Sequence, residues 1–201
     1  MMHIQLFLFF SIFLKCSLQL DTVFTNKSVK FIECLIHNEQ YSYEYLVNLP
    51  NIVDTMTQLN TYPLSLINNF NRIKWLLIRT GYNSSNLFYL KSMTRNEFLC
   101  ASTDEHVWKK KKRRLIKLVH LDSMIKNDFT CKWSFKKVNK HKQTTNKYTI
   151  WNNYFNESMY ASFFVHRFDI YSRYVYLWNE KPDSKQFNWF IDCNKGVFLA
   201  S

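Results

Sequence analysis

The sequence predicts an all-β protein of about twelve short strands with little helix. Two observations carry this prediction: one residue pattern occurs three times, and short runs of alternating apolar and polar residues recur along the chain. The clearest copy contains Asn156-Glu-Ser-Met-Tyr-Ala-Ser162, and its spacing returns in Asn96-Glu-Phe-Leu-Cys-Ala-Ser102. A tryptophan follows each copy, at Trp75, Trp133 and Trp189. The expected repeats cover about 31–80, 86–138 and 147–193.

Residues 1–19 predict a secretory signal peptide. The apolar run 6–14 is too short to span a bilayer and has the length of a signal-peptide core. Small residues near Cys16 and Ser17 place the cleavage site between about 16 and 20. The alternative is a signal anchor, which is disfavoured because no second apolar segment of membrane length follows. We therefore expect a secreted, extracellular protein without a transmembrane span, with a single domain over 20–201.

The first repeat is the least regular of the three. Alternating apolar residues predict its two opening strands, and a polar turn separates them. The segment 49–60 fits one or two helical turns, and Pro63 interrupts the strand-like stretch that follows. The expected strands are 31–36, 43–47, one within 61–70, and 73–79.

The second and third repeats show four strand signals each. A long basic loop is expected over 102–112, a turn at 126–128 and a turn cluster at 179–184. The polar segment 139–147 reads as the loop between the two repeats. The expected strands are 87–91, 98–101, 114–119 and 132–138, then 148–151, 159–162, 174–178 and 188–193.

Three four-strand units resemble the β-trefoil. In that fold the outer strands of each repeat build a six-stranded barrel, and the middle pairs form three hairpins that cap one end. The motif Asn-Glu-x-[Leu/Met]-x-Ala-Ser at 96–102 and 156–162 is followed by Arg-x-[Ile/Val]-x-Leu and then by a tryptophan strand. This unit is similar to the trefoil half of silkworm low-molecular-weight haemolymph lipoproteins, which are secreted insect proteins. The resemblance covers about 31–193 and implies a closed barrel without open sheet edges.

Ricin-type lectins are trefoils whose repeats carry a Gln-x-Trp motif. The corresponding triplets here are Ile73-Lys-Trp75, Cys131-Lys-Trp133 and Phe187-Asn-Trp189, which keep the tryptophan but lack the glutamine. We therefore assign no ricin-type sugar site and expect all three tryptophans in the barrel core. Fibroblast growth factors and interleukin-1-like cytokines are also trefoils, which implies that the fold can carry a basic, anion-binding surface.

Secretion changes the interpretation of the cysteines. An even number remains after removal of the signal, in an oxidising compartment that favours disulfides. Four cysteines allow three pairings, and free buried thiols are the alternative. The sequence contains no CxxC motif, and no Cys/His cluster has the spacing of a zinc site. Neither a metal nor a cofactor is therefore expected. The disulfide candidates are Cys34, Cys100, Cys131 and Cys193, and the glycosylation candidates are Asn26, Asn83 and Asn156.

The formal net charge is +12, which favours anionic partners. The strongest local feature is a run of six cations, and a second group lies in the loop between repeats two and three. The run could be a solvated loop, a polyanion site or a processing site for a basic-specific protease. The polyanion candidates are Lys109, Lys110, Lys111, Lys112, Arg113, Arg114, Lys136, Lys137, Lys140 and Lys142.

No catalytic constellation is recognisable in the sequence. There is no HExxH, GxSxG or phosphate loop, and the histidines are scattered. Glu44, Glu97 and Glu157 recur in register, which is typical of a structural role. We expect a monomeric, non-catalytic binding protein that engages acidic glycans or an extracellular protein, and no nucleic acid. The alternatives are a structural or storage-type secreted protein, or a small-lipid carrier.

Overall fold

The computed structural model describes residues 31–48, 59–80, 86–108, 111–138, 146–166, 169–179 and 184–194. Within these ranges the chain forms twelve strands, the short helix α2 (Leu121–Lys126) and four 3-10 helices. No helix in the described part of the chain is both long and apolar enough to cross a membrane. The predicted signal peptide, residues 1–19, lies outside the described residues and stays a prediction.

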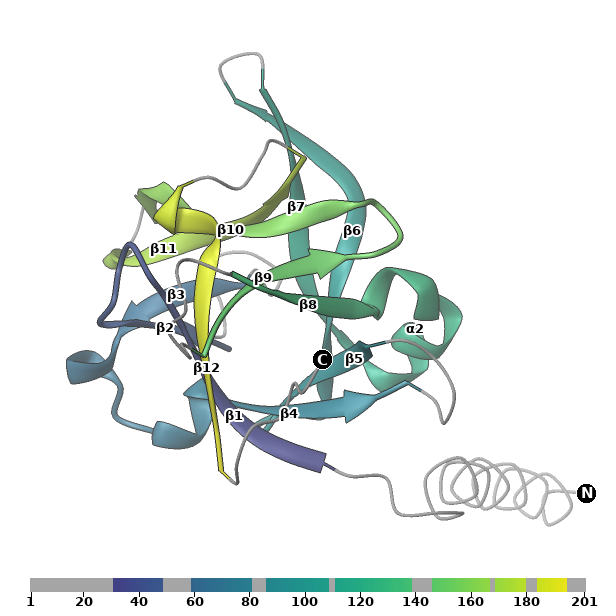
Figure 1. The fold of residues 1–201 in the computed structure, drawn as a ribbon, viewed down its shortest axis with the longest axis horizontal. Coiled ribbons are helices and arrows are strands. Elements are labelled where there is room, and N and C mark those ends of the chain that lie inside the picture. Colours follow the sequence, from purple (N-terminus) through teal and green to yellow (C-terminus); the bar gives the residue numbers. More distant parts are fainter. Residues whose placement is uncertain are drawn as a thin grey trace, which may run out of the picture. The chain divides into compact units, whose positions relative to one another are not determined.

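Six strands close into a barrel (Figure 1). Each pairs with two others in an antiparallel ring, β1–β4–β5–β8–β9–β12, and β12 pairs with β1 to close it. Closure leaves the barrel without an open edge. The barrel strands are β1 (Phe31–Asn38), β4 (Lys74–Arg79), β5 (Leu87–Ser92), β8 (Trp133–Lys137), β9 (Lys147–Asn152) and β12 (Asn188–Cys193).

The other six strands form three hairpins, one from each repeat. β11 joins them, because it pairs with β3 of the first hairpin and with β7 of the second. A six-stranded barrel with three hairpins is the β-trefoil predicted from the sequence. The hairpins are β2 (Glu44–Val47) with β3 (Asn60–Pro63), β6 (Glu97–Trp108) with β7 (Lys111–His120), and β10 (Glu157–His166) with β11 (Asp169–Trp178).

The three repeated tryptophans lie in the core, as expected. Each is fully buried. Burial would cost the polar indole N–H its hydrogen bond to water, so each Nε1 donates to a main-chain carbonyl instead. The acceptors lie at equivalent positions of the three hairpins: Trp75 to Leu46 at 3.0 Å, Trp133 to Leu99 at 2.8 Å and Trp189 to Met159 at 3.1 Å. These bonds attach each hairpin to its own barrel strand.

A second set of equivalent residues surrounds the pseudo-threefold axis where the hairpins meet. Leu59, Ile116 and Val175 are each fully buried. The main-chain N–H of Leu59 donates to Ile116 at 3.4 Å, and that of Val175 donates to Leu59 at 3.2 Å. The hairpins are therefore joined by main-chain hydrogen bonds as well as by apolar packing.

Two disulfides link the four predicted cysteines. Cys34 in β1 is bonded to Cys193 in β12, 159 residues away. Cys100 in β6 is bonded to Cys131, at the end of the 3-10 helix Asp128–Cys131, across 31 residues. The first bridge closes the barrel between its first and last strands, and the second fastens a hairpin to its repeat.

The hairpins depart most from the sequence prediction. The expected loop 102–112 is wrong for most of its length, because β6 reaches Trp108 and β7 starts at Lys111. The third repeat's middle strands are likewise longer than expected, at Glu157–His166 and Asp169–Trp178. Residues 121–131 form α2 and a 3-10 helix around the predicted turn. Most of the helical segment expected at 49–60 lies outside the described residues.

Candidate functional site

The basic run lies on the β6–β7 hairpin. Trp108 pairs with Lys111, and the chain passes between them through Lys109 and Lys110, which lie outside the described residues. We call Lys109–Lys112 the basic tip. The Lys112 side chain is 73 % exposed, and its Nζ lies 3.3 Å from Glu105, a surface ion pair that leaves the ammonium accessible to other anions.

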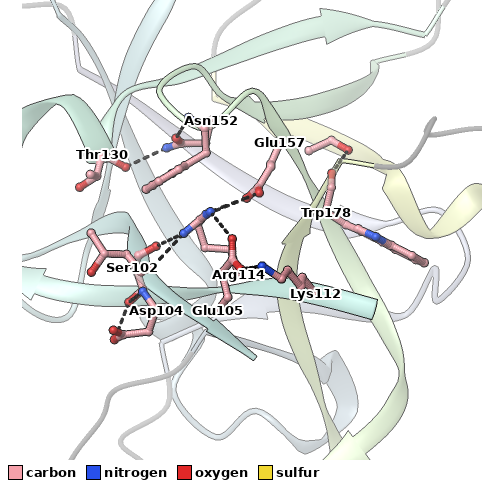
Figure 2. Close-up of polar contacts among 12 residues, drawn as sticks. Ser102, Asp104, Glu105, Lys112, Arg114, Thr130, Asn152, Glu157 and Trp178 are labelled. Atoms are coloured by element: carbon pink, nitrogen blue, oxygen red, sulfur yellow. Dashed lines mark hydrogen bonds and ion pairs between the residues drawn. The ribbon is translucent and has the colours of Figure 1, made fainter. Parts of the chain in front are cut away.

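Arg114 does not belong to that accessible surface. Its side chain is only 8 % exposed and its guanidinium is surrounded by acceptors (Figure 2). Nε donates to Glu157 at 2.9 Å, and Nη2 contacts Glu105 at 3.0 Å. Nη1 donates to the main-chain oxygens of Ser102 and Thr103, at 3.1 and 3.0 Å. The five donors of a guanidinium are thereby largely satisfied within the protein.

These acceptors explain why the hairpin keeps its shape. Between two pairs of facing residues, Ala101–Ile116 and Glu105–Arg114, residues 102–104 of β6 lie opposite Leu115 alone. Such a bulge leaves main-chain carbonyls without strand partners. Arg114 binds two of them, so it stabilises the bulge and connects it to Glu157 of the third repeat.

Arg113 is also buried, against a different set of groups. Its guanidinium carbon lies 5.1 Å from the Trp178 ring centre, 5.4 Å from Tyr160 and 6.0 Å from Tyr176. The arginine thus lies among aromatic rings of the neighbouring β10–β11 hairpin, where cation–π attraction offsets part of its desolvation. Its Nε has no hydrogen-bond partner among the described residues.

The burial of Arg113 and Arg114 therefore differs from the prediction that all six cations of the run are candidates for binding a polyanion. Arg113 and Arg114 are adjacent in β7, so strand alternation would leave one of them exposed. Both are nevertheless buried, because each contacts residues of the third repeat. Arg114 is buried and paired with carboxylates, and Arg113 is buried among aromatic rings, so neither guanidinium is accessible to an external polyanion in this conformation. We leave Arg113 and Arg114 out of the candidate surface.

The described part of the second basic group, Lys136 and Lys137, lies at the end of β8 away from the hairpin cap. Trp133, at the start of β8, contacts the hairpin cap through Leu99, and the strand then runs away from the cap to Lys136 and Lys137. Lys137 is exposed, and Lys136 is exposed with its Nζ 3.9 Å from the Trp151 ring centre. The structure thus does not bring the two groups together. The remaining members of the second group, Lys140 and Lys142, lie outside the described residues.

Acidic side chains modify the charge of the β6–β7 hairpin. Lys117 donates to Asp104 at 2.7 Å, and the Ser102 hydroxyl donates to the same carboxylate at 3.0 Å. The bonds from Lys117 and Ser102 lower the pKa of Asp104. Asp104 therefore stays ionised at neutral pH beside the base of the hairpin.

The three repeated glutamates connect neighbouring repeats. Glu157 binds Arg114 of the second repeat, and Glu44 binds Arg173 of the third, with an Nε–Oε1 distance of 2.8 Å. Glu97 accepts from the side-chain amide of Asn48 in the first repeat at 3.0 Å. These contacts follow one another around the pseudo-threefold axis, which accounts for the recurrence of the glutamates.

One glycosylation candidate lies among the described residues. Asn156 is exposed in the β9–β10 turn and has a φ of 52°, in the left-handed region that asparagine tolerates well. Its amide is therefore at the surface, as a glycosylation acceptor requires. Asn26 and Asn83 lie outside the described residues.

Comparison with known proteins supports the fold and does not assign the chain to a family. No protein-family model matches the chain, and no curated protein is similar to it in sequence. Solved structures do match. A BEL β-trefoil shares 9 % sequence identity with a TM-score of 0.57, and the alignment covers 84 % of this chain and 97 % of that one.

Two further matches come from a mosquito and a plant. A Culex salivary protein of the Cysteine and Tryptophan-Rich family is 13 % identical with a TM-score of 0.54, covering 83 % of this chain and 96 % of that one. An SDF2-like protein from Arabidopsis thaliana is 12 % identical with a TM-score of 0.58, covering 84 % and 94 %. At these identities the likeness shows the fold alone.

Proposed function

We propose that the chain is a secreted, non-catalytic binding protein that engages acidic glycans through the basic tip, Lys109–Lys112. The observation that carries the proposal is the position of this run at the end of a hairpin whose base is fixed by Arg114. A fixed base lowers the conformational entropy that the hairpin loses when a ligand binds. Sulfates and carboxylates of a glycan would neutralise the mutual repulsion of the adjacent lysines.

Secretion is part of the same proposal. Two disulfides in a chain of 201 residues are typical of oxidising compartments. The exposed Asn156, which begins a sequon, and the apolar run near the N-terminus agree with that location. Acidic glycans are abundant polyanions outside cells, whereas nucleic acid is not the expected partner of a secreted protein.

The alternative of a small-lipid carrier is disfavoured by the interior. The main cluster of buried apolar residues draws on the barrel strands and the hairpins and includes all three repeated tryptophans, each with 0 % exposure. A carrier of the lipocalin kind keeps space for its ligand inside the barrel. A structural or storage role, in which the charge serves only solubility, remains the competing proposal and is tested below.

The experiment compares two variants that each lose four lysines. The first replaces Lys109–Lys112 by Ser, and the second replaces Lys136, Lys137, Lys140 and Lys142 by Ser. Both lower the net charge equally, so they separate position from total charge. Wild type and variants are eluted with salt from immobilised heparin and from a sulfonate cation exchanger of matched charge density.

The proposal expects wild type to elute from heparin at clearly higher salt than from the sulfonate resin. Release of counterions makes such binding salt-dependent, by analogy with nucleic acids. Loss of that difference in the first variant, and its retention in the second, would assign the glycan surface to the basic tip. Equal elution from both resins, or equal loss in both variants, would favour the structural role.

A further inference from the structure

The tip of the β10–β11 hairpin exposes a group of large apolar side chains. Phe163 is 71 % exposed and Ile170 is 68 % exposed. Exposure of single apolar residues is ordinary, but a contiguous group marks an interaction site. We call this group the apolar tip: Phe163, Phe164, Val165, Ile170 and Tyr171.

The neighbouring hairpin extends the same surface. β11 pairs with β3 through Arg173–Thr61 and Tyr174–Asn60, so the start of β11 continues alongside the end of β3 (Figure 1). Burial and the nearby Asp169 carboxylate raise the pKa of Tyr62, which agrees with this proximity. Beyond Tyr62, the 3-10 helix Leu64–Leu66 exposes both of its leucines, at 38 % and 42 %.

A third segment joins the surface through the main chain. The N–H of Leu64 donates to the carbonyl of Tyr43 at 3.0 Å, and the Tyr43 side chain is 82 % exposed. The apolar tip, the two leucines and Tyr43 make up eight of the fourteen large apolar residues exposed in the described part of the chain. Exposed apolar area is therefore concentrated in one region of the molecule.

The exposure pattern indicates what covers the tip. The register of the hairpin shifts between Ala161 and Val165 and again beyond Val165, so regular alternation does not apply there, and Phe163, Phe164 and Val165 are each at least 38 % exposed. On the returning strand Ile170 and Tyr171 are exposed in succession as well. A rigid protein partner would have to match this irregular outline, whereas a fluid apolar medium that the tip enters covers all of these side chains.

The net charge indicates which medium. A formal charge of +12 opposes contact with a second copy of the chain and favours an anionic surface. Phenylalanine, tyrosine and isoleucine are suited to the boundary between headgroups and acyl chains, where aromatic residues of membrane proteins collect. We propose that the apolar tip inserts into the surface of a lipid bilayer that contains anionic phospholipid.

This inference uses a different surface from the proposed glycan site. β7 and β11 are antiparallel where they pair at Leu115–Tyr176 and Arg114–Leu177. Going along β7 towards the basic tip therefore means going along β11 away from the apolar tip. Lipid insertion and glycan binding consequently fail or succeed separately.

The test uses the mature disulfide-bonded protein with sedimenting vesicles of phosphatidylcholine alone and of phosphatidylcholine with about one third phosphatidylserine, near the composition of a strongly anionic leaflet. The tip variant carries Phe163→Ser and Ile170→Ser. The matched control carries Met93→Ser and Ile125→Ser, which remove two other exposed apolar side chains, 39 % and 57 % exposed, from the second repeat. The third variant replaces Lys109–Lys112 by Ser.

We expect wild type and the control to sediment with the anionic vesicles and to bind neutral vesicles more weakly. The tip variant should bind the anionic vesicles at least about tenfold less well, because two apolar side chains no longer leave water. Equal binding by wild type and the tip variant would overturn the proposal, and so would equal binding to neutral and anionic vesicles.

Sedimentation equilibrium of the same proteins without vesicles tests the competing occupant. A wild type that self-associates and fails to bind vesicles, together with a monomeric tip variant, would assign the surface to a second copy and overturn the lipid proposal. The Lys109–Lys112 variant should keep most of its vesicle binding even if it loses heparin binding. Loss of both activities to the same degree would show that net charge alone drives adsorption, which also overturns insertion.

Discussion

The β6–β7 and β10–β11 hairpins share one design at their bases. In each hairpin, an alanine that faces the returning strand, Ala101 or Ala161, is followed by a bulge. The bulges are residues 102–104 and 162–164, and each lies opposite a single residue of the returning strand. The serine hydroxyl that begins each bulge accepts the main-chain N–H two residues on, at 3.1 Å in both cases. An arginine from the returning strand then binds a bulge carbonyl and a glutamate of the next repeat, and these arginines are Arg114 and Arg173.

Immediately outside that base the two hairpins differ. Leu99 and Met159 occupy equivalent positions, so Cys100 corresponds to Tyr160 and Cys131 to Phe187. The second repeat joins this pair by a disulfide. The third packs two aromatic rings there, with centres 5.2 Å apart. One hairpin is held by a covalent bond and the other by apolar contact at the same place.

The tips differ most. One ends in four consecutive lysines and the other in a cluster of exposed apolar residues. Residues that repeat in this molecule lie at the bases and carry the fold, as the bulge arginines and core tryptophans do. Residues that break the repeat lie where nothing in the fold requires them, and both proposed binding surfaces consist of such residues.

The largest expected effect follows from removing the Arg114 side chain, which fixes the base of the β6–β7 hairpin. Arg114→Ala leaves Glu157, Glu105 and two bulge carbonyls without their common donor, and should lower the free energy of unfolding by about 3–5 kcal/mol. Arg173→Ala should cost less, about 1–3 kcal/mol, because the Arg173 side chain is 20 % exposed and water can replace part of its contacts. Urea unfolding of both variants measures the difference.

Lys112→Ala is the matched control for the charge that Arg114→Ala removes. Its side chain is exposed, so its effect on unfolding should stay within about 0.5 kcal/mol. Equal losses for the two arginine variants, or a loss below about 1 kcal/mol for Arg114→Ala, would contradict the idea that Arg114 fixes the hairpin.

The second effect concerns the bond that only the β6–β7 hairpin has. Replacing Cys100 and Cys131 by Ala removes a bridge that closes 31 residues and should lower the free energy of unfolding by about 2–4 kcal/mol. Cys100→Val with Cys131→Ile introduces the pair found in the first repeat, where Val47 and Ile73 are both fully buried. This variant should recover part of the loss by apolar packing. Identical free energies of unfolding for the two variants would mean that the larger Val and Ile side chains do not pack in the space left by the disulfide.

The bases of the hairpins were visible in the sequence, whereas the lengths of the hairpins were not. Repetition of Glu, Ser and Trp at fixed spacing predicted three units, a trefoil and a buried role for Trp75, Trp133 and Trp189. Strand lengths failed because the bulge at 102–104 interrupts the alternation on which strand prediction depends. The loop predicted at 102–112 hid the length of the β6–β7 hairpin, and the strands predicted at 159–162 and 174–178 stopped short of the β10–β11 tip.

Charge patterns misled for a related reason. Six adjacent cations look equivalent in the sequence, yet Arg113 and Arg114 are buried because a neighbouring repeat supplies aromatic rings and a carboxylate. Contacts between repeats depend on register around the pseudo-threefold axis, which local sequence does not contain. The apolar tip, by contrast, had a readable signal. Apolar residues over 163–171 exceeded what a solvated loop requires.

The third prediction concerns substitutions at the two tips, which should hardly change the free energy of unfolding. Lys112, Phe163 and Ile170 are exposed, so we expect Lys109–Lys112→Ser and Phe163→Ser with Ile170→Ser each to change the free energy of unfolding by no more than about 0.5 kcal/mol. A thermal-shift series alongside urea unfolding measures this. A loss above about 2 kcal/mol at one tip would show that its residues pack in the fold and would remove the basis for treating that tip as a free binding surface.

The smallest expected effect is a change in the titration of one carboxyl group, at a bulge position that is acidic in one hairpin and apolar in the other. Asp104 and Phe164 are equivalent residues of the bulges, and only Asp104 titrates. Its pKa is lowered from 3.8 by hydrogen bonds from Lys117 and Ser102. A carboxyl group whose pKa is lower in the folded state stabilises the fold above its unfolded pKa, and that contribution is lost as the pH falls through the folded pKa. Lys117→Met should therefore raise the Asp104 pKa towards 3.8, as followed by NMR of the carboxyl carbon. An unchanged titration would show that the Lys117 contact does not persist in solution, and Ser102→Ala would then test the hydroxyl alone.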